Sequence, residues 1–217
     1  MALQFELMKP DEMNECIKIA AKAFENYDFF SVYIPSDRKR PLFLRSMIGT
    51  EYRVNRGLVH YLVAKENGKI VAVATVRSPE YQMPSEKQYL RAGFWKNLVI
   101  GGYKNVVAWY EMDQAAGKPC QELGGNTWYL HLLAVDVKSE GKGIGSRMLK
   151  ECVIPYVKEH GGETLSLYTN SEINRKFYIK NGFHEFHEQR FSYSGRSFGS
   201  WSYRMDLAQK TTETIHV

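Results

Sequence analysis

The sequence predicts one α/β domain over residues 1–207, in which helices flank a central sheet. Its 217 residues are 44% hydrophobic and 24% charged, the composition of a globular chain that can bury a core. Strands alternate with helices in the second half, and such strand–helix–strand units require a parallel or mixed sheet. A segment over residues 78–126 is expected to form a helical insertion. The polar residues 208–217 should form a frayed tail.

The first half predicts two helices and a strand hairpin. A strand is expected at 3–8 and a helix from about Glu12, because apolar residues recur there at three- and four-residue steps. The aromatic segment 26–35 should be a loop, either a packed connector or a wall of a substrate pocket. A second helix is expected at 41–57.

A tight hairpin should join two strands at 58–66 and 69–77. The dipeptide Asn67-Gly68 separates these apolar runs. Both central residues of a two-residue hairpin turn need a positive φ, which asparagine and glycine adopt more readily than other residues. We therefore expect two antiparallel strands here.

The segment 78–126 is rich in aromatic residues and predicts two helices. Residues 85–88 have the spacing of a capping box, so the first helix should begin at Glu86. The glycine pair at 101–102 should separate the two helices, and a loop is expected around 117–119 and at the following glycine pair. These helices would either shape an acceptor pocket or cover one face of the sheet.

The second half predicts four strands and two helices. Residues 127–137 form the most continuous apolar run, which suits a central strand buried on both faces. A helix is expected over 143–160, with a kink at Pro155. The remaining expected elements are a helix at 172–181 and strands at 163–169, 184–193 and 200–207.

The formal charge of +5 comes from 29 basic and 24 acidic residues, which are spread along the chain. A mild positive field suits a polyanionic cofactor, or serves only solubility. Nucleic-acid binding needs a clustered basic face or a recognisable module, and the sequence has neither. We therefore expect no nucleic-acid partner.

Three widely spaced cysteines, Cys16, Cys120 and Cys152, indicate free thiols in a reducing cytosol. Neither C-x-x-C nor H-E-x-x-H occurs, so no metal site is expected. The first residues lack the pattern of a signal peptide, and no apolar run approaches the about 18 residues of a membrane helix. The sequence predicts a cytoplasmic protein without a membrane partner.

The first chemical motif is a glycine-rich turn, E-G-K-G-I-G-S at 140–146, between a strand and a helix. The first N–H groups of a helix have no partner within it, the helix dipole places positive charge there, and glycine lets the backbone approach a phosphate. Residues 141–146 should therefore form an anion cradle, to which Lys142 could add charge. A purely structural turn is the alternative.

The second motif places Asn174 and Tyr178 on one face of the helix at 172–181, because residues four apart are neighbours on a helix. The asparagine could bond a ligand amide, and the tyrosine hydroxyl could give a proton to a leaving thiolate. Taken alone, the segment also fits an ordinary capped helix in which Phe177 and Tyr178 belong to the core.

Together, the two motifs resemble those of the GNAT N-acetyltransferase superfamily. Residues 140–145 read E-x-x-G-x-G where the family has Q/R-x-x-G-x-G/A, and 174–183 read N-x-x-x-Y-x-x-x-G-F as in the family. The resemblance covers 127–191 and extends to 3–77. It implies a mixed, mostly antiparallel sheet with a splayed strand pair that grips the pantetheine arm of coenzyme A. The helices before residue 128 also look like the branch that contains puromycin N-acetyltransferase.

The resemblance implies a role for each part of the site. Asn174 would bond acetyl-CoA, and Tyr178 would be the general acid toward the thiolate. Strand residues would bond the pantetheine arm through their backbone, and turn residues would hold the pyrophosphate. These are Leu133, Ala134 and Val135 in the strand, and Gly141, Lys142, Gly143, Ile144, Gly145 and Ser146 in the turn. Glu140 departs from the family pattern, and a carboxylate there is unfavourable unless it points outward.

The implied reaction transfers an acetyl group from acetyl-CoA to a primary amine, expected to be that of a small molecule, by direct attack on the thioester. The amine must first lose a proton, which calls for a base or a water relay. His131 titrates in a useful range, although it could also be structural. Tyr129, Glu111 and Asp113 are further candidates.

Two other functions stay open. One is acetylation of a protein or peptide, which the positive charge of the chain disfavours for a cationic acceptor. The other is a non-catalytic acyl-CoA-binding regulatory module, against which Tyr178 argues. A homodimer through a sheet edge is a further interpretation of the sequence.

Overall fold

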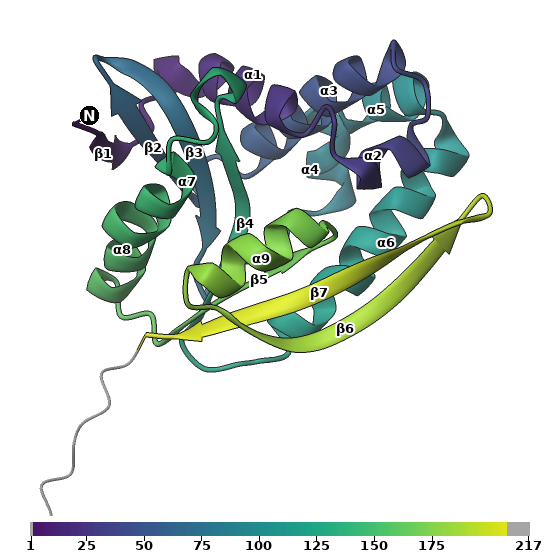
Figure 1. Cartoon of the computed structure of the whole chain (residues 1–217). Helices are drawn as coiled ribbons and strands as arrows, with labels where there is room; N and C mark the ends of the chain where they lie inside the picture. Colours follow the sequence, from purple (N-terminus) through teal and green to yellow (C-terminus); the bar gives the residue numbers. More distant parts are fainter. Residues whose placement is uncertain (1, 208–217) are drawn as a thin grey trace, which may run out of the picture.

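The computed structural model describes residues 2–207 and shows a seven-stranded sheet with helices packed against it (Figure 1). The strand order is β1-β2-β3-β4-β5-β7-β6, and only β4 and β5 pair in parallel. The expected mixed, mostly antiparallel sheet is confirmed. The strands are β1 (Gln4–Leu7), β2 (His60–Glu66), β3 (Lys69–Arg77), β4 (Thr127–Val135), β5 (Thr164–Thr169), β6 (His184–Tyr193) and β7 (Arg196–Asp206). The predicted tail at 208–217 lies outside the described residues.

The parallel pair β4–β5 separates soon after it begins. Its paired positions run only from Thr127 opposite Thr164 to Tyr129 opposite Ser166. β4 nevertheless continues beside β3 to Val135, and β5 continues beside β7. The sheet therefore opens between the second halves of β4 and β5.

The first half of the chain contains the predicted hairpin and one α-helix more than predicted. Asn67 and Gly68 have φ values of 51° and 75°, as the turn between β2 and β3 requires. The helices are η1 (Pro10–Glu12), α1 (Met13–Ala23), α2 (Asp28–Tyr33) and α3 (Lys39–Val54).

The loop predicted at 26–35 is wrong, because α2 occupies most of it. The ring of Phe29 lies 4.9 Å from that of Phe30 and 5.7 Å from that of Tyr33, one helical turn later. All three side chains are buried. Packing of this aromatic group stabilises a helix that is too short to be stable alone.

Three helices, not the two predicted, follow β3: α4 (Glu86–Arg91), α5 (Phe94–Gly101) and α6 (Tyr103–Gln121). The capping box is confirmed, since the Ser85 N–H donates to Gln88 Oε1 at 2.8 Å. Gly102, with φ of 84°, separates α5 from α6.

The loop predicted around 117–119 is wrong, because α6 continues through it. Pro119 has no N–H to donate to the carbonyl of Ala115, four residues earlier. The side-chain amide of Gln189 on β6 donates to that carbonyl instead, at 3.3 Å. The buried side chains of Trp109, Met112, Ala116 and Cys120 recur every three or four residues, so tertiary packing outweighs the local helix breakers.

The helix predicted at 143–160 is continuous but irregular. After η2 (Val137–Ser139) it consists of α7 (Ile144–Arg147), a π-helical turn (Met148–Val153) and α8 (Ile154–Glu159). The disturbance predicted at Pro155 thus takes the form of a wide turn just before the proline. α9 (Glu172–Lys180) lies between β5 and β6 in the chain.

Hydrophobic cores cover both faces of the sheet. The side chains of β2 alternate between them: Val63 packs with α1, α3 and α6, whereas Leu62 and Ala64 pack with α7, α8 and α9. No helix within residues 2–207 is long and apolar enough to cross a membrane.

Candidate functional site

A cavity lies where β4 and β5 separate, and residues of the predicted central strand and of the second predicted motif line it, whereas the glycine turn at 141–146 is not part of its lining. His131 and Leu133 contribute from β4, and Asn174 and Tyr178 contribute from α9. Helices α3 to α6 supply much of the remaining wall. The fold therefore brings the central strand and the Asn–Tyr helix to one site.

Tyr178 presents a protonated hydroxyl to this cavity. Its side chain is 8% exposed, and its ring packs against Phe177, Phe183 and Tyr203. The hydroxyl has no hydrogen-bond partner within residues 2–207. Burial raises the pKa of Tyr178, so the phenol keeps its proton at neutral pH and can donate it.

The glycine turn lies beside α9. Gly141 and Gly143 have φ values of 74° and 75°, which glycine adopts without strain. A Cβ added at Gly145 would come within 3.3 Å of the Phe177 ring. The helix start and the Asn–Tyr helix thus pack closely, and Glu140 is exposed to solvent at the mouth of the turn.

The expected pantetheine residues lie on the open edge of β4. Leu133, Ala134 and Val135 pair with β3 on one side. On the other side the pairing with β5 has already ended at Tyr129. In this region, the backbone groups of β4 that face β5 are therefore not paired with it.

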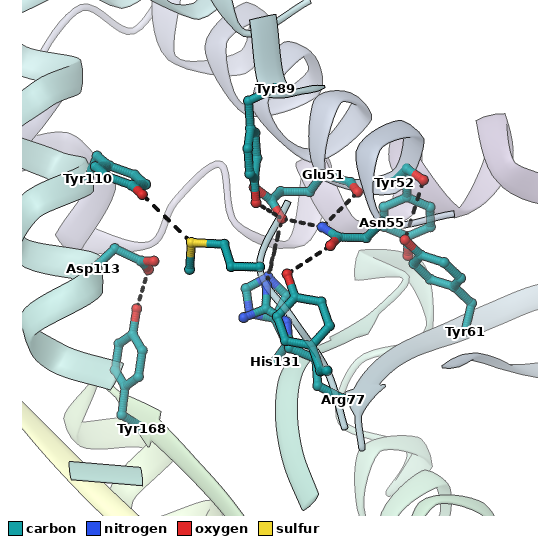
Figure 2. Close-up of polar contacts among 12 residues, drawn as sticks. Glu51, Tyr52, Asn55, Tyr61, Arg77, Tyr89, Tyr110, Asp113, His131 and Tyr168 are labelled. Atoms are coloured by element: carbon teal, nitrogen blue, oxygen red, sulfur yellow. Dashed lines mark hydrogen bonds and ion pairs between the residues drawn. The ribbon is translucent and has the colours of Figure 1, made fainter. Parts of the chain in front are cut away.

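A polar cluster joins α3, β3 and β4 (Figure 2). The Arg77 guanidinium lies 3.7 Å from Glu51 Oε2 and 3.3 Å from His131 Nε2. Asn55 donates to Glu51 Oε2 at 2.9 Å and accepts from the Tyr81 hydroxyl at 2.8 Å. This network fixes the carboxylate of Glu51 beside a cation.

His131 is a neutral acceptor in this cluster. Arginine has only donors, so the contact with Arg77 assigns the lone pair of the imidazole to Nε2 and its proton to Nδ1. Burial and the Arg77 charge lower the pKa of His131 well below its ordinary value. The expectation that His131 titrates in a useful range is therefore wrong, because the charged form is disfavoured twice.

A second polar pair lies apart from this cluster (Figure 2). The Tyr168 hydroxyl, from β5, donates to Asp113 Oδ1, from α6. Burial raises the pKa of Asp113 above its ordinary value, although the hydrogen bond from Tyr168 and the charge of Arg77 oppose that shift. Glu111, the other candidate in this helix, is exposed and does not line the cavity.

Sequence reasoning missed Glu51 and Arg77. Glu51 follows Met47 and Ile48 by four and three residues, so it continues the apolar face of its helix, and that placement was a usable signal. Arg77 ends a strand, where a basic residue is ordinarily solvated, and only the tertiary structure shows that it is buried.

The mixed sheet that opens at its parallel pair, beside a glycine turn and a buried tyrosine, agrees with the class of acyltransferase enzymes that the family comparison gives. The chain belongs to the Acetyltransferase (GNAT) family, which it matches over residues 23–183. The expected membership is thereby confirmed, while the likeness to the puromycin branch stays a prediction.

Solved structures share this fold at low sequence identity. A histone acetyltransferase HPA2 and related acetyltransferase from Corynebacterium glutamicum is 18% identical, with a TM-score of 0.64 over 97% of this chain and 99% of that chain. The polyamine N-acetyltransferase of Drosophila melanogaster is 15% identical, with a TM-score of 0.60 over 95% and 100%. PaiA N-acetyltransferase from Thermoplasma acidophilum, in complex with coenzyme A, is 14% identical, with a TM-score of 0.53 over 95% and 99%. No curated protein matches the chain.

Proposed function

We propose that this protein transfers an acetyl group from acetyl-CoA to a primary amine of a small molecule by direct attack. The observation that carries the proposal is the cavity at the β4–β5 opening, lined by Leu133, Asn174 and Tyr178 among others. Acceptor and thioester would meet there in one orientation, and orientation alone can contribute a large share of the rate.

Acetyl-CoA fits the groups around the opening. Leu133, Ala134 and Val135 would bond the pantetheine arm through the free edge of β4, and Asn174 would bond the cofactor from α9. The turn from Gly141 to Ser146, with Lys142, would hold the pyrophosphate at a helix start, where N–H groups and the helix dipole favour anions. Glu140 is exposed, so its carboxylate can stay in water when the phosphates bind.

Tyr178 would be the general acid of the reaction. Acetyl-CoA supplies the acyl group and a thiolate leaving group. Burial raises the pKa of Tyr178, so its hydroxyl is protonated at neutral pH and would be available as the donor to the thiolate. This role also distinguishes the enzyme from a module that only binds acyl-CoA.

A small acceptor is favoured over a protein, because aromatic side chains from several helices and strands surround the cavity. These side chains include Phe24, Tyr27, Phe30, Phe94, Trp109 and Tyr110. A concave pocket with a mostly apolar lining is typical of small-molecule sites. We place the enzyme in the cytosol, because its three buried cysteines are free. The sheet-edge homodimer stays a prediction.

The test is release of the coenzyme A thiol from acetyl-CoA in the presence of a panel of small primary amines. We expect release that depends on both the protein and an amine, together with formation of the N-acetyl product. Thiol release at the same rate without any amine would instead indicate simple hydrolysis and would reject the proposed transfer.

A further inference from the structure

We propose that the acceptor is a primary amine with one positive charge on a ring-bearing body, and that Asp113 binds its ammonium group and takes its proton. This inference rests on the proposed function and names the substrate class of that site. It also assigns the base that the sequence left open among several residues.

The charges around the cavity favour a single cation. The residues that line it include two carboxylates, Glu51 and Asp113, one guanidinium, Arg77, and the neutral His131. Arg77 lies 3.7 Å from Glu51 and compensates it. Asp113 has no basic side chain paired with it among the described residues 2–207, and burial raises its pKa, so one bound ammonium group would stabilise its carboxylate form. A second cation on the same acceptor would approach Arg77 and be repelled.

Asp113 is placed to receive that ammonium group. Its Oδ1 accepts the hydroxyl proton of Tyr168, and its Oδ2 has no hydrogen-bond partner within the described residues 2–207. Tyr168 lies on β5 two residues beyond Ser166, where the pairing with β4 ends. The carboxylate therefore lies at the opening through which the thioester would reach the acceptor.

The walls of the cavity suit a ring. Trp109 precedes Asp113 by four residues, so both lie on the same face of α6, and Phe30 packs near the Trp109 ring at 6.3 Å. Aromatic faces attract apolar rings and also stabilise a nearby ammonium group.

Two buried polar side chains indicate that the ring carries a polar substituent. Asn97 is 1% exposed and Trp109 is 7% exposed, and both line the cavity. Neither the side-chain amide of Asn97 nor Trp109 Nε1 has a hydrogen-bond partner within residues 2–207. Buried polar groups in native proteins are nearly always bonded, so a bound acceptor with a hydroxyl or carbonyl group would satisfy them.

The proton transfers balance. The Asp113 carboxylate takes one proton from the ammonium group, and the nitrogen lone pair forms the C–N bond to the thioester carbonyl. As the C–S bond breaks, the sulfur takes the electron pair and the proton of Tyr178. The acylated nitrogen loses its remaining extra proton, which restores Tyr178, and Asp113 releases its proton to solvent.

The first test compares three acceptors with the full chain and saturating acetyl-CoA: tyramine, spermidine and a peptide with one lysine. Tyramine has one cation, a ring and a hydroxyl, so its kcat/KM should exceed both others by about 100-fold. Preference for spermidine or the peptide would overturn the inference and leave acetyl transfer intact. Failure of the protein to bind acetyl-CoA at all would reject the proposed function, and this inference with it.

The second test is Asp113→Asn, with Glu111→Gln as the control on the exposed side of the same helix. Asp113→Asn should lower kcat/KM for tyramine by about 100-fold or more and leave acetyl-CoA binding unchanged, whereas Glu111→Gln should change neither. Circular dichroism verifies that each variant is folded. Equal activity of Asp113→Asn and the parent protein would contradict the assignment.

A pH profile separates a base from a merely structural carboxylate. Burial disfavours the charged form of Asp113, whereas the Tyr168 hydrogen bond and the charge of Arg77 favour it. The charge of Asp113 also acts on three neighbouring ionisable groups, which are Glu51, Tyr110 and Tyr129. As pH rises, kcat/KM should increase with a midpoint above the ordinary pKa of aspartate. Tyr168→Phe should move this midpoint to higher pH, because the carboxylate loses its donor. A midpoint that does not move would contradict the role of Asp113 as the base.

Discussion

At the scale of single residues, the chemistry depends on a tyrosine whose proton is both retained and reachable. Tyr178 is buried among aromatic rings, and this burial raises its pKa, but Tyr178 also lines the cavity. Asn174, one turn earlier on α9, lines the same cavity. A four-residue spacing could be predicted from the sequence because helix geometry alone determines it.

Replacing Tyr178 by phenylalanine should separate chemistry from binding. The Tyr178→Phe variant loses the proton donor but keeps the ring, so kcat should fall by about 100-fold or more while the Kd for acetyl-CoA stays the same. Steady-state kinetics and calorimetry measure the two quantities.

Tyr203→Phe is the matched control for that variant. Tyr203 is also fully buried, but its hydroxyl donates to Glu185 at 2.6 Å and lies outside the cavity lining. Loss of the Tyr203 hydroxyl should lower the free energy of unfolding by about 1 kcal/mol and leave kcat unchanged. Full activity of Tyr178→Phe would disprove the general-acid role.

The polar residues around Arg77 show why part of the site could not be predicted from sequence. Glu51, Arg77 and His131 lie on three elements that are far apart in the chain, and their distances depend on strand register. The sequence pointed to His131 from its ordinary pKa, but burial and a neighbouring cation remove that property. The surroundings of His131, and not its residue type, determine its protonation state.

At the scale of elements, the glycine turn before α7 is the proposed phosphate cradle. A Gly143→Ala variant would place a side chain at φ of 75°, which costs about 1 kcal/mol, and would add a methyl group where the phosphates approach. We expect the Kd for acetyl-CoA to rise by about tenfold or more, measured by calorimetry.

Gly195→Ala in the β6–β7 turn controls for backbone strain. Gly195 has φ of 76°, and a Cβ added there would meet no atom within 4 Å, as at Gly143. Both variants should lose similar thermal stability, but only Gly143→Ala should bind acetyl-CoA more weakly. Equal affinities in the two variants would contradict the cradle.

The predicted secondary structure is confirmed where residues close together in the sequence determine it, and it is wrong where contacts between distant residues determine it. The Asn67-Gly68 turn and the capping box at Ser85 are local, and both are present. The end of α6 was misplaced because Pro119 breaks a helix in isolation. Only the fold brings Gln189 to the carbonyl that Pro119 leaves unpaired.

At the scale of the whole molecule, all three cysteines are buried: Cys16 and Cys152 lie in the cores on the two faces of the sheet, and the Cys120 thiol donates to the carbonyl of Leu167 at 3.2 Å. Burial raises the pKa of Cys16 and Cys120 to about 12 and that of Cys152 to about 11. The thiolate is the reactive form, so at pH 8 these groups should be protonated and unreactive in the folded protein.

A thiol-labelling experiment tests that packing. With a disulfide reagent at pH 8, labelling of the native protein should be slow and should follow the urea unfolding transition, after which three thiols react. Rapid modification of any cysteine before unfolding would show that its surroundings are open to solvent.

The whole-molecule claim is that the opening between β4 and β5 makes this fold an acetyl-CoA site. Calorimetric titration of the purified protein with acetyl-CoA tests it most directly, with NAD as a second phosphate-bearing ligand for comparison. Saturable one-to-one binding of acetyl-CoA, and no heat with NAD, is the predicted result. Absence of acetyl-CoA binding would mean that Glu140 disables the turn or that only the architecture is shared, and the roles given to Asn174 and Tyr178 would be wrong.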